Sequence, residues 1–425
     1  MSEVGECPLT PIESWFFDHA TSSSVQSFNQ SVCVEASQRV TASQVRSAMH
    51  RLARRHDAWR SRFDRTSSGS WRHAVLSREA SSVSSSVMVS EADVSGVWSS
   101  MADASEASAA EREAMRAIAD EAHRSLDVSR GPVARAVVVD RGAGRRQAVV
   151  IVAHHLVVDG VSWRVLLDDM ERMWSSSIAS ASEGEESESV GMSWREWSSR
   201  LVIAAASHES MRSDAAVWQS LVGSGDESWW RPFAERSESD GRRSWRVTAS
   251  SMRELDEETT RRLIEQAGQA VGGRIDDVLV SAVSLAVGRC GGSSGSRVGV
   301  MLEGHGRDAL SGIDEEASES ASEMVGWFTS MFMLCVGAES VDESSASSVR
   351  GLVKRVKEQL RSAPRRGSSQ GLVRRFGTSS SASAVRSACD RASPQVLFNY
   401  LGQWDESSSS SSSSTAASSR QWCPS

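Results

Sequence analysis

The sequence predicts a mixed α/β protein built from two lobes. The chain has 425 residues, whereas a single hydrophobic core stops growing at about 250–300 residues. Hydrophobic residues make up 39% of the chain, which is enough for a sizeable core. Segments with helical periodicity alternate with short apolar runs, as in mixed α/β folds. We predict an N-terminal lobe over 1–180, a C-terminal lobe over 181–405 and a Ser-rich, disordered tail over 406–425.

The elements of the first lobe follow from local signals. Thr10, Pro11 and Glu13 supply a cap residue, a proline at the first helical position and a capping-box glutamate, which together predict a helix start. Further helices are predicted around 45–53 and 161–174 from their apolar spacing. The continuous apolar run 148–153 predicts a buried strand. A helix end, a Gly-Pro turn and a strand are predicted over 126–139.

A Ser- and Glu-rich stretch at 175–190 predicts the linker to the second lobe. Beyond it, helices are predicted at 194–206, around 217, from 257, near 276 and at 349–360. Short strands are predicted at 298–302, 331–336 and 395–398, with a turn-rich stretch at 291–295. No structure is predicted after 407, because serine runs cannot bury enough apolar surface to offset chain entropy.

Composition argues against several classes of function. The formal net charge of −8 does not favour a nucleic-acid partner. No apolar run reaches the length of about 18 residues that a membrane span needs, and the N-terminus does not resemble a signal peptide. The six cysteines are scattered without a CxxC pair, which argues against a disulfide framework or a zinc site. We therefore expect a cytoplasmic protein with no membrane, nucleic-acid or metal partner.

The segment HHLVVDGVSW at 154–163 carries the strongest chemical signal. A predicted strand delivers His154 and His155 to its end, and a turn brings Asp159 back four residues after the second histidine. Histidine is the side chain best suited to proton transfer near neutral pH, and a nearby carboxylate orients the ring or holds the loop. From this segment alone, a catalytic histidine and a histidine pair that caps a strand remain equally open.

Other motifs accompany this segment. They are LTPIESWFF at 9–17, FNQS at 28–31, EGHGRD at 303–308, VGWFTSMF at 325–332 and FNYLGQWD at 398–405. With HHxxxDG, this ordered set resembles the condensation-domain superfamily of non-ribosomal peptide synthetases, and its wording resembles the epimerization branch. The resemblance covers roughly residues 8–405. It implies two chloramphenicol-acetyltransferase-like lobes in a V-shaped arrangement, with the active site between them.

The resemblance implies a reaction as well as a fold. The reaction is epimerization of the Cα of an L-aminoacyl or peptidyl thioester. The thioester acidifies the Cα proton, and the enolate that forms must be stabilised while it exists. The substrate would arrive on the 4′-phosphopantetheine arm of a peptidyl carrier protein or domain of a non-ribosomal peptide synthetase. The resemblance implies no cofactor bound by this chain itself.

The resemblance also assigns residues. Glu303 and His155 match the two positions that the family uses for proton transfer, and the direction of each transfer stays open. The alternative for Glu303 is an ordinary surface glutamate. His154 is predicted to be structural. Asp159 is also predicted to be structural, through a salt bridge or hydrogen bonds in the turn.

Supporting residues are predicted around the same site. Arg307 either supports the glutamate of the EGHGRD segment or holds the loop, with an ion pair in solvent as the alternative. Asn399 and Tyr400 match positions that the family places near the active site. Tyr400, the single tyrosine of the chain, is predicted to donate to the enolate or substrate carbonyl oxygen, and the alternative is a buried tyrosine at a strand end. Trp327 and Phe328 are predicted to belong to the core.

The sequence departs from the family pattern in two places. The family domain continues for several strands beyond FNYLGQ, and strands missing there would expose a sheet edge. In addition, PRRGSSQGLVRRF at 364–376 has Ser369 and Gln370 where the family has aromatic and glycine residues. Two other functions stay open. One is condensation-type acyl transfer, in which His155 assists attack of an amine on a thioester. The other is a catalytically degenerate fold that binds a carrier protein.

Overall fold

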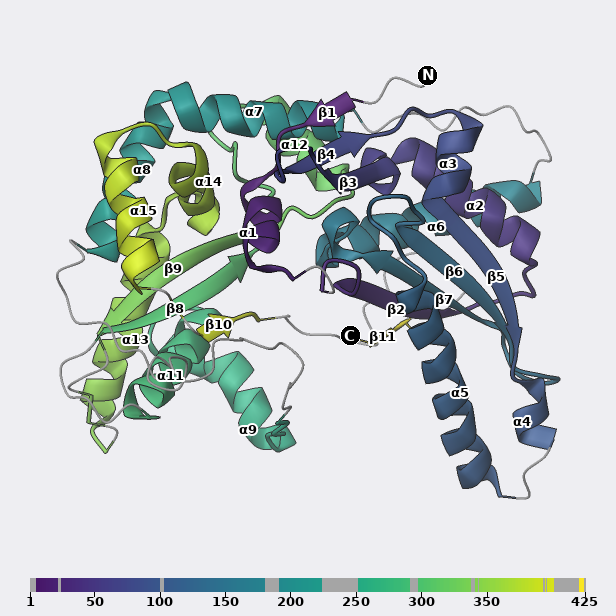
Figure 1. Cartoon of the computed structure of the whole chain (residues 1–425). Helices are drawn as coiled ribbons and strands as arrows, with labels where there is room; N and C mark the ends of the chain where they lie inside the picture. The colour runs from purple at the N-terminus through teal and green to yellow at the C-terminus, as the bar shows by residue number, and fades with distance from the viewer. Residues whose placement is uncertain are drawn as a thin grey trace, which may run out of the picture. The chain divides into compact units, whose positions relative to one another are not determined.

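The structure is a computed structural model. It describes residues 5–21, 24–99, 103–179, 191–223, 251–290, 297–337, 341–342, 344–392, 394, 396–400 and 420–423. By their internal contacts they fall into two compact units (Figure 1). Unit 1 comprises 1–201, 314–328 and 403–425, and unit 2 comprises 202–313 and 329–402. The predicted lobe boundary between 180 and 181 lies outside the described residues.

The core of unit 1 is a five-stranded sheet in the order β11-β2-β7-β6-β5. The strands are β2 (Asn29–Glu35), β5 (Val87–Asp93), β6 (Ala134–Asp140), β7 (Ala148–His154) and β11 (Arg420–Cys423). Strands β5 and β6 run parallel, and the other neighbours pair antiparallel. Asn29 pairs with His154 where β2 begins and β7 ends. The residues just before β2 and just after β7 therefore lie together at the same end of these two paired strands.

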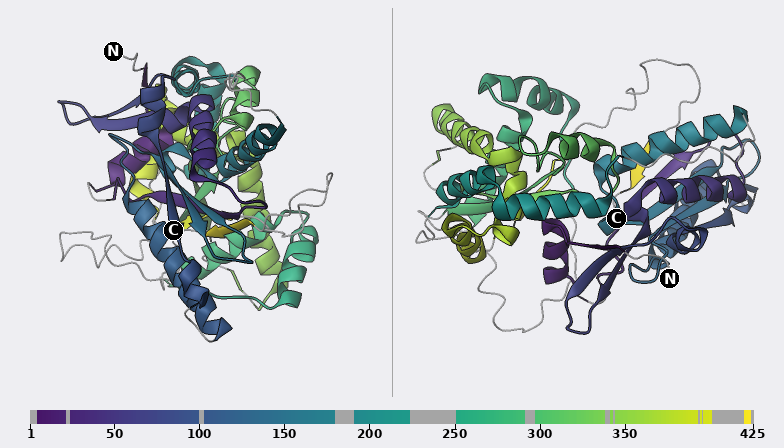
Figure 2. Two further views of the ribbon diagram at one scale, coloured as in Figure 1. Left: turned by 90° about the vertical axis from the view of Figure 1, so that its right-hand side faces the viewer. Right: turned by 90° about the horizontal axis from the view of Figure 1, so that it is seen from above.

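Both faces of strands β6 and β7 are buried. On one face, alternate residues such as Val139, Val150 and Val152 pack against helix α5 (Ala104–Arg124). Helices α2 (Ala42–Arg55) and α6 (Gly160–Ala179) lie on the other side of the sheet (Figures 1 and 2). Every residue of β7 is buried, which explains the continuous apolar run in the sequence and confirms the predicted buried strand.

Helix α1 (Pro11–His19) begins where the sequence predicted. The Glu13 carboxylate accepts the Thr10 N–H at 2.8 Å, and the Thr10 hydroxyl accepts the Glu13 N–H. The predicted capping box is therefore confirmed. The other elements of unit 1 are β1 (Gly5–Cys7), η1 (Asp57–Arg60), β3 (Ser61–Arg65), β4 (Trp71–Val75), α3 (Ala80–Ser86), α4 (Ser95–Ser99), η2 (His155–Val157), α12 (Glu315–Glu323) and the start of α7 (Trp194–Ser207).

Two expectations for low-complexity segments differ from the structure. Residues 175–179 of the predicted linker belong to helix α6, and 180–190 lie outside the described residues. Within the tail expected to be disordered, Arg420–Cys423 form strand β11, which pairs antiparallel with residues 31–34 of β2. The open backbone groups of the β2 edge provide partners that a local composition argument does not consider. Residues 406–419 and 424–425 of the tail lie outside the described residues.

Unit 2 has a three-stranded sheet in the order β10-β8-β9. Its strands are β8 (Arg297–Gly304), β9 (Ser330–Gly337) and β10 (Val396–Phe398). The helical elements are α8 (Glu209–Val222), α9 (Glu257–Arg262), η3 (Leu263–Ala267), α10 (Gly268–Ala270), α11 (Ile275–Cys290), α13 (Ala346–Ser362), η4 (Pro364–Gly367), α14 (Ser368–Phe376) and α15 (Ser380–Ala392). The predicted helices and strands of this part of the chain are present. The predicted turn-rich stretch at 291–295 lies outside the described residues.

Strand β8 lies between β9, with which it pairs antiparallel, and β10, with which it pairs parallel. Helices α8 and α14 pack against β9, and α11 packs against β8. Ser369 and Gln370, which differ from the family pattern, both make hydrogen bonds. Gln370 accepts the Met333 N–H at 2.8 Å, and Ser369 accepts the indole N–H of Trp218 at 2.9 Å. Both departing residues are buried. The core of unit 2 thus satisfies these polar side chains with hydrogen bonds.

Candidate active site

His154 is the last residue of β7 and is fully buried. Its Nε2–H donates to the Val25 carbonyl at 2.7 Å, and its Nδ1 accepts the Leu156 N–H at 3.1 Å. Burial lowers the pKa of His154 to about 3. Both ring nitrogens of this neutral histidine are therefore used inside the protein, which is the geometry of a structural residue.

His155 follows directly in the turn η2 and packs against two aromatic rings, which also contact each other. Its imidazole stacks on Phe28 at 4.8 Å between ring centroids, and the Trp327 ring lies 4.7 Å away. Nδ1 lies 2.8 Å from the Val158 carbonyl, and Nε2 lies 2.8 Å from the side-chain nitrogen of Gln30. Burial lowers the pKa of His155 below its ordinary value. The ring is thus held in the neutral form that accepts protons.

Asp159 fixes the loop that follows His155. One carboxylate oxygen accepts the Ser162 N–H at 2.8 Å and the Ser162 hydroxyl at 2.7 Å. The other oxygen accepts the Phe328 N–H at 3.1 Å. The Asp159 side chain therefore joins the start of helix α6 to a segment that lies 169 positions further along the chain. These three hydrogen bonds fasten the turn to this distant backbone.

The same distant segment requires glycine at position 326. The Gly326 N–H donates to the Ser162 hydroxyl at 3.1 Å. A Cβ atom on Gly326 would lie 2.1 Å from the ring of Trp194, and the φ angle of this glycine is +156°. Trp327 and Phe328, which come next, are both buried. Their burial agrees with the prediction of core residues, and Trp327 is in addition a wall of the His155 site.

Glu303 is the penultimate residue of β8, so the strand extends past the predicted end at 302. Strand β10 runs parallel to β8 with Phe398 opposite Leu302. The residues that follow these two, Asn399 and Glu303, therefore lie beside each other. The Asn399 amide accordingly donates a hydrogen bond to Glu303 Oε2. Burial raises the pKa of the Glu303 carboxyl above its ordinary value. A raised pKa favours the protonated form, which is the form that can donate a proton.

The remaining predicted residues lie near Glu303 in the chain or in the sheet. Tyr400 follows Asn399 at the end of β10 and is partly buried. Arg307 is buried on the segment after β8, and its backbone N–H donates to His305 Nδ1 at 3.2 Å. The structure therefore brings Glu303 together with Asn399 in unit 2. It brings His154, His155 and Asp159 together in unit 1.

Two neighbours of His155 were not assigned a role from the sequence. Gln30 and Phe28 contact the imidazole from the beginning of β2. Both belong to the FNQS segment, which accompanied the other motifs in order. Because Asn29 pairs with His154, the antiparallel register places this segment beside His155. The FNQS motif was the only signal in the sequence for these two residues. Their contact with His155 could be inferred only once the pairing of β2 with β7 was known.

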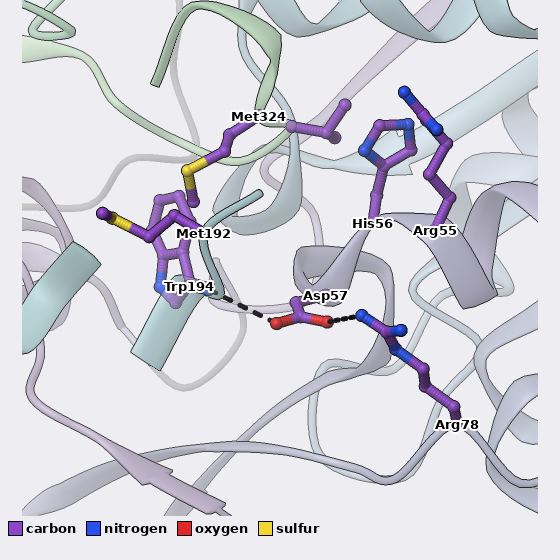
Figure 3. Close-up of a pocket in the computed structure, with 8 residues that line it drawn as sticks. Arg55, His56, Asp57, Arg78, Met192, Trp194 and Met324 are labelled. Atoms are coloured by element: carbon purple, nitrogen blue, oxygen red, sulfur yellow. Dashed lines mark hydrogen bonds and ion pairs between the residues drawn. The ribbon is translucent and has the colours of Figure 1, made fainter. Parts of the chain in front are cut away.

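Unit 1 also contains a pocket beside the end of α2, which Figure 3 shows in close-up. It is lined by Arg55, His56, Asp57, Arg78, Met192, Trp194, Met324 and Val325. Arg78 lies 3.9 Å from Asp57, Arg55 lies 2.9 Å from Asp169 and His56 lies 2.7 Å from Asp169. Burial lowers the pKa of His56. The arginine and aspartate side chains of this pocket are engaged in ion pairs, and no site residue predicted from the sequence lines it.

Metal ligands and membrane spans have recognisable geometry. Within the described part of the chain, no group of three or more His, Cys, Asp or Glu side chains is arranged to hold a metal ion. No described helix combines the length and apolar composition needed to cross a bilayer.

Relatives identified by sequence cover nearly the whole chain. One subunit of the linear gramicidin synthase of Brevibacillus parabrevis is 32% identical over 406 residues, which are 95% of this chain and 5% of that protein. Chondramide synthase cmdD of Chondromyces crocatus is 31% identical over 406 residues, which are 94% of this chain and 9% of that protein. The chain therefore spans less than a tenth of the length of these two relatives.

Solved structures share the fold. The epimerization domain from the third module of tyrocidine synthetase B matches with a TM-score of 0.68 at 22% identity, over 95% of this chain and 83% of that domain. The condensation domain from Monacolin K polyketide synthase matches with a TM-score of 0.60 at 15% identity, over 89% and 77% of the two chains. The expected chloramphenicol-acetyltransferase-like fold of condensation and epimerization domains is thus confirmed. The family model described as "Condensation domain" matches residues 3–424, so the chain belongs to the condensation-domain family.

Proposed function

We propose that this chain epimerises the Cα of an L-aminoacyl or peptidyl thioester in non-ribosomal peptide synthesis. The substrate is presented on the 4′-phosphopantetheine arm of a peptidyl carrier protein, and the reaction takes place in the cytoplasm. His155 and Glu303 are the two groups that handle the Cα proton. The observation that carries the proposal is the Glu303 carboxyl, which burial keeps at a raised pKa and which Asn399 orients.

The proposed chemistry moves one proton off the Cα and one proton onto it. A base takes the Cα proton, and the electrons of the C–H bond pass into the thioester carbonyl to form an enolate. An acid then returns a proton to the opposite face of the same carbon, and the enolate electrons re-form the C–H bond. Neutral His155 is suited to accept a proton, and Glu303 with its raised pKa is suited to donate one. The roles exchange in the reverse direction.

The residues around Glu303 support this role. A carboxyl group that takes part in the reaction needs a fixed orientation, and the Asn399 amide supplies a hydrogen bond to Oε2. Tyr400 comes next in the chain, and we assign its hydroxyl as the donor to the enolate or carbonyl oxygen. In the proposal, Arg307 supports this end of β8. One of the similar solved structures is an epimerization domain, which agrees with the assignment.

Condensation-type acyl transfer is the second candidate function. The matching family model is the condensation domain, and neutral His155 is also suited to assist an amine that attacks a thioester. This alternative gives no role to the Glu303 carboxyl or to its hydrogen bond from Asn399. The two functions form different products, namely an inverted stereocentre or a new amide bond.

A stereochemical assay separates the candidates. The full chain is incubated with an L-aminoacyl thioester on a peptidyl carrier protein, with and without a second loaded carrier, and the products are resolved on a chiral column. We expect a mixture of L and D thioester in both reactions, which Glu303→Gln no longer produces. A new amide product without inversion would contradict the proposal and favour acyl transfer. Binding of the loaded carrier without either product would identify a degenerate carrier-binding fold.

A further inference from the structure

A short chain of hydrogen bonds runs from Trp163 through Gln30 to His155. The indole N–H of Trp163 donates to Gln30 Oε1 at 2.9 Å. The Gln30 side-chain nitrogen lies 2.8 Å from His155 Nε2. An indole nitrogen is a donor only, so the group that faces it must be the amide oxygen. Trp163 therefore determines which way the Gln30 amide points.

The amide orientation in turn determines the tautomer of His155. The NH2 group of Gln30 is a donor only, so His155 Nε2 must accept from it with a lone pair. The hydrogen of the neutral ring then lies on Nδ1, which donates to the Val158 carbonyl at 2.8 Å. This assignment satisfies both ring nitrogens of His155. The opposite tautomer would direct Nε2–H at the NH2 group and Nδ1 at a carbonyl oxygen.

We propose that Gln30 is a positioning residue that holds His155 as its Nδ1–H tautomer with the lone pair on Nε2, and that Trp163 orients Gln30 for this task. The part that concerns catalysis rests on the proposed function. There, Nε2 is the atom that takes the Cα proton, once the substrate has displaced the NH2 group of Gln30 from the Nε2 lone pair. The Phe28 ring, stacked on the imidazole within 11° of parallel, holds the ring plane in which this lone pair lies.

The same geometry opposes protonation of His155. An imidazolium carries hydrogen on both nitrogens, so Nε2–H would face the NH2 group of Gln30. Relief requires rotation of the amide so that its oxygen faces Nε2, and this rotation breaks the hydrogen bond from Trp163. Of the neighbouring ionisable groups, Asp159 raises the pKa of His155. His154 is neutral near pH 7, because its own pKa is about 3. Gln30 and Trp163 thus add to the effect of burial.

Nitrogen NMR of the full chain labelled with 15N-histidine tests the assignment directly. The His155 signals are identified by their loss in His155→Gln. We expect hydrogen on Nδ1 and a lone pair on Nε2 in the wild type at pH 7.5. In Trp163→Phe the amide is free to rotate, and we expect the pKa of His155 to rise by about one pH unit, a tenfold change in its protonation equilibrium. In Gln30→Glu the new carboxylate accepts from Nε2–H, and we expect a larger rise.

Trp98→Phe is the matched control, because Trp98 lies on helix α4 under Arg145. It should leave the His155 pKa unchanged. Hydrogen on Nε2 of the wild-type ring would overturn the proposal without any variant. An unchanged His155 pKa in both folded variants would also overturn it.

Activity supplies an independent readout. If His155 is the base, the acidic limb of kcat/KM against pH should shift upward in Trp163→Phe by the same amount as the NMR pKa. If the NMR result is as expected and the wild type exchanges no Cα proton at any pH, the proposed function fails while the tautomer assignment stands. If exchange occurs and the tautomer is the opposite one, the positioning role alone fails.

Discussion

Replacement of Asp159 by alanine removes three hydrogen bonds at once. The Asp159 carboxylate accepts from the Ser162 N–H, the Ser162 hydroxyl and the Phe328 N–H, at 2.7 to 3.1 Å. The side chain is 3% exposed, so water does not reach these donors in its place. After truncation, the two backbone N–H groups of Ser162 and Phe328 lose this acceptor. The variant therefore loses hydrogen bonds in a buried place, where the loss is most costly.

The magnitude follows from these contacts. A hydrogen bond to a charged group contributes about 1.5–3 kcal/mol, and each buried donor left without its acceptor costs about 1–3 kcal/mol. For the two backbone N–H groups that lose the carboxylate, we expect Asp159→Ala to lower the free energy of unfolding by about 2–6 kcal/mol, a large part of a typical stability of about 5–15 kcal/mol. Asp159→Asn keeps one acceptor oxygen for Ser162 but turns an NH2 group toward the Phe328 N–H. We expect it to lose about 1.5–3 kcal/mol.

Urea unfolding followed by circular dichroism measures these differences. The matched control is Asp168→Ala, at an exposed aspartate on helix α6, which begins directly after Asp159; it should change stability by about 0.5 kcal/mol at most. The predicted order of stability is wild type and Asp168→Ala, then Asp159→Asn, then Asp159→Ala. If Asp159→Ala unfolded at the same urea concentration as the exposed control, the role assigned to this carboxylate would be wrong.

Three further predictions concern pH and packing. Because burial lowers the pKa of His154 to about 3, this histidine takes up a proton in the unfolded chain, and not in the folded one, as pH falls below about 6.5. It therefore lowers stability by up to about 1.4 kcal/mol per pH unit. Urea unfolding from pH 7 to 5 should show a smaller loss in His154→Gln than in the wild type, since His56 and His155 contribute in both. Burial raises the pKa of Glu303, so ionisation of this carboxyl destabilises the folded state as pH rises. Thermal unfolding should find Glu303→Gln more stable than the wild type at pH 8, with a difference in stability that shrinks toward pH 4. A stability difference that grows toward pH 4 would contradict the buried environment of this carboxyl. Gly326→Ala places a Cβ atom 2.1 Å from the Trp194 ring and should lower the free energy of unfolding, measured with urea, by about 3 kcal/mol or more. An unfolding midpoint equal to that of the wild type would show that the ring moves freely.

Local signals predicted the elements that carry the site. The capping box at Thr10 set the start of α1, and the apolar run before His154 predicted a strand that is buried on both faces. In each case the physical cause lies within a few neighbouring residues. The prediction that Asp159 holds the turn also follows from local chemistry, since its nearest partner Ser162 is three positions away.

Contacts between distant segments could not be predicted in the same way. The Phe328 N–H that completes the Asp159 network lies 169 positions from it, and Gln30 lies 125 positions from His155. The Gln30 contact depends on the register of β2 and β7, which a sequence pattern leaves open until the strands are paired. The Phe328 contact depends on how a distant loop packs against the start of α6. Strand β11 follows the same rule, because the open edge of β2 and not local composition provides its partners.

Exchange of the substrate Cα proton tests the central claim most directly. An L-aminoacyl thioester on its carrier protein is incubated with the full chain in deuterated water, and the gain of one mass unit is followed by mass spectrometry. We predict rapid incorporation with the wild type, and loss of incorporation in both His155→Ala and Glu303→Gln while each variant remains folded. Incorporation at the wild-type rate in either folded variant would contradict the assignment of these two side chains as the groups that move the proton.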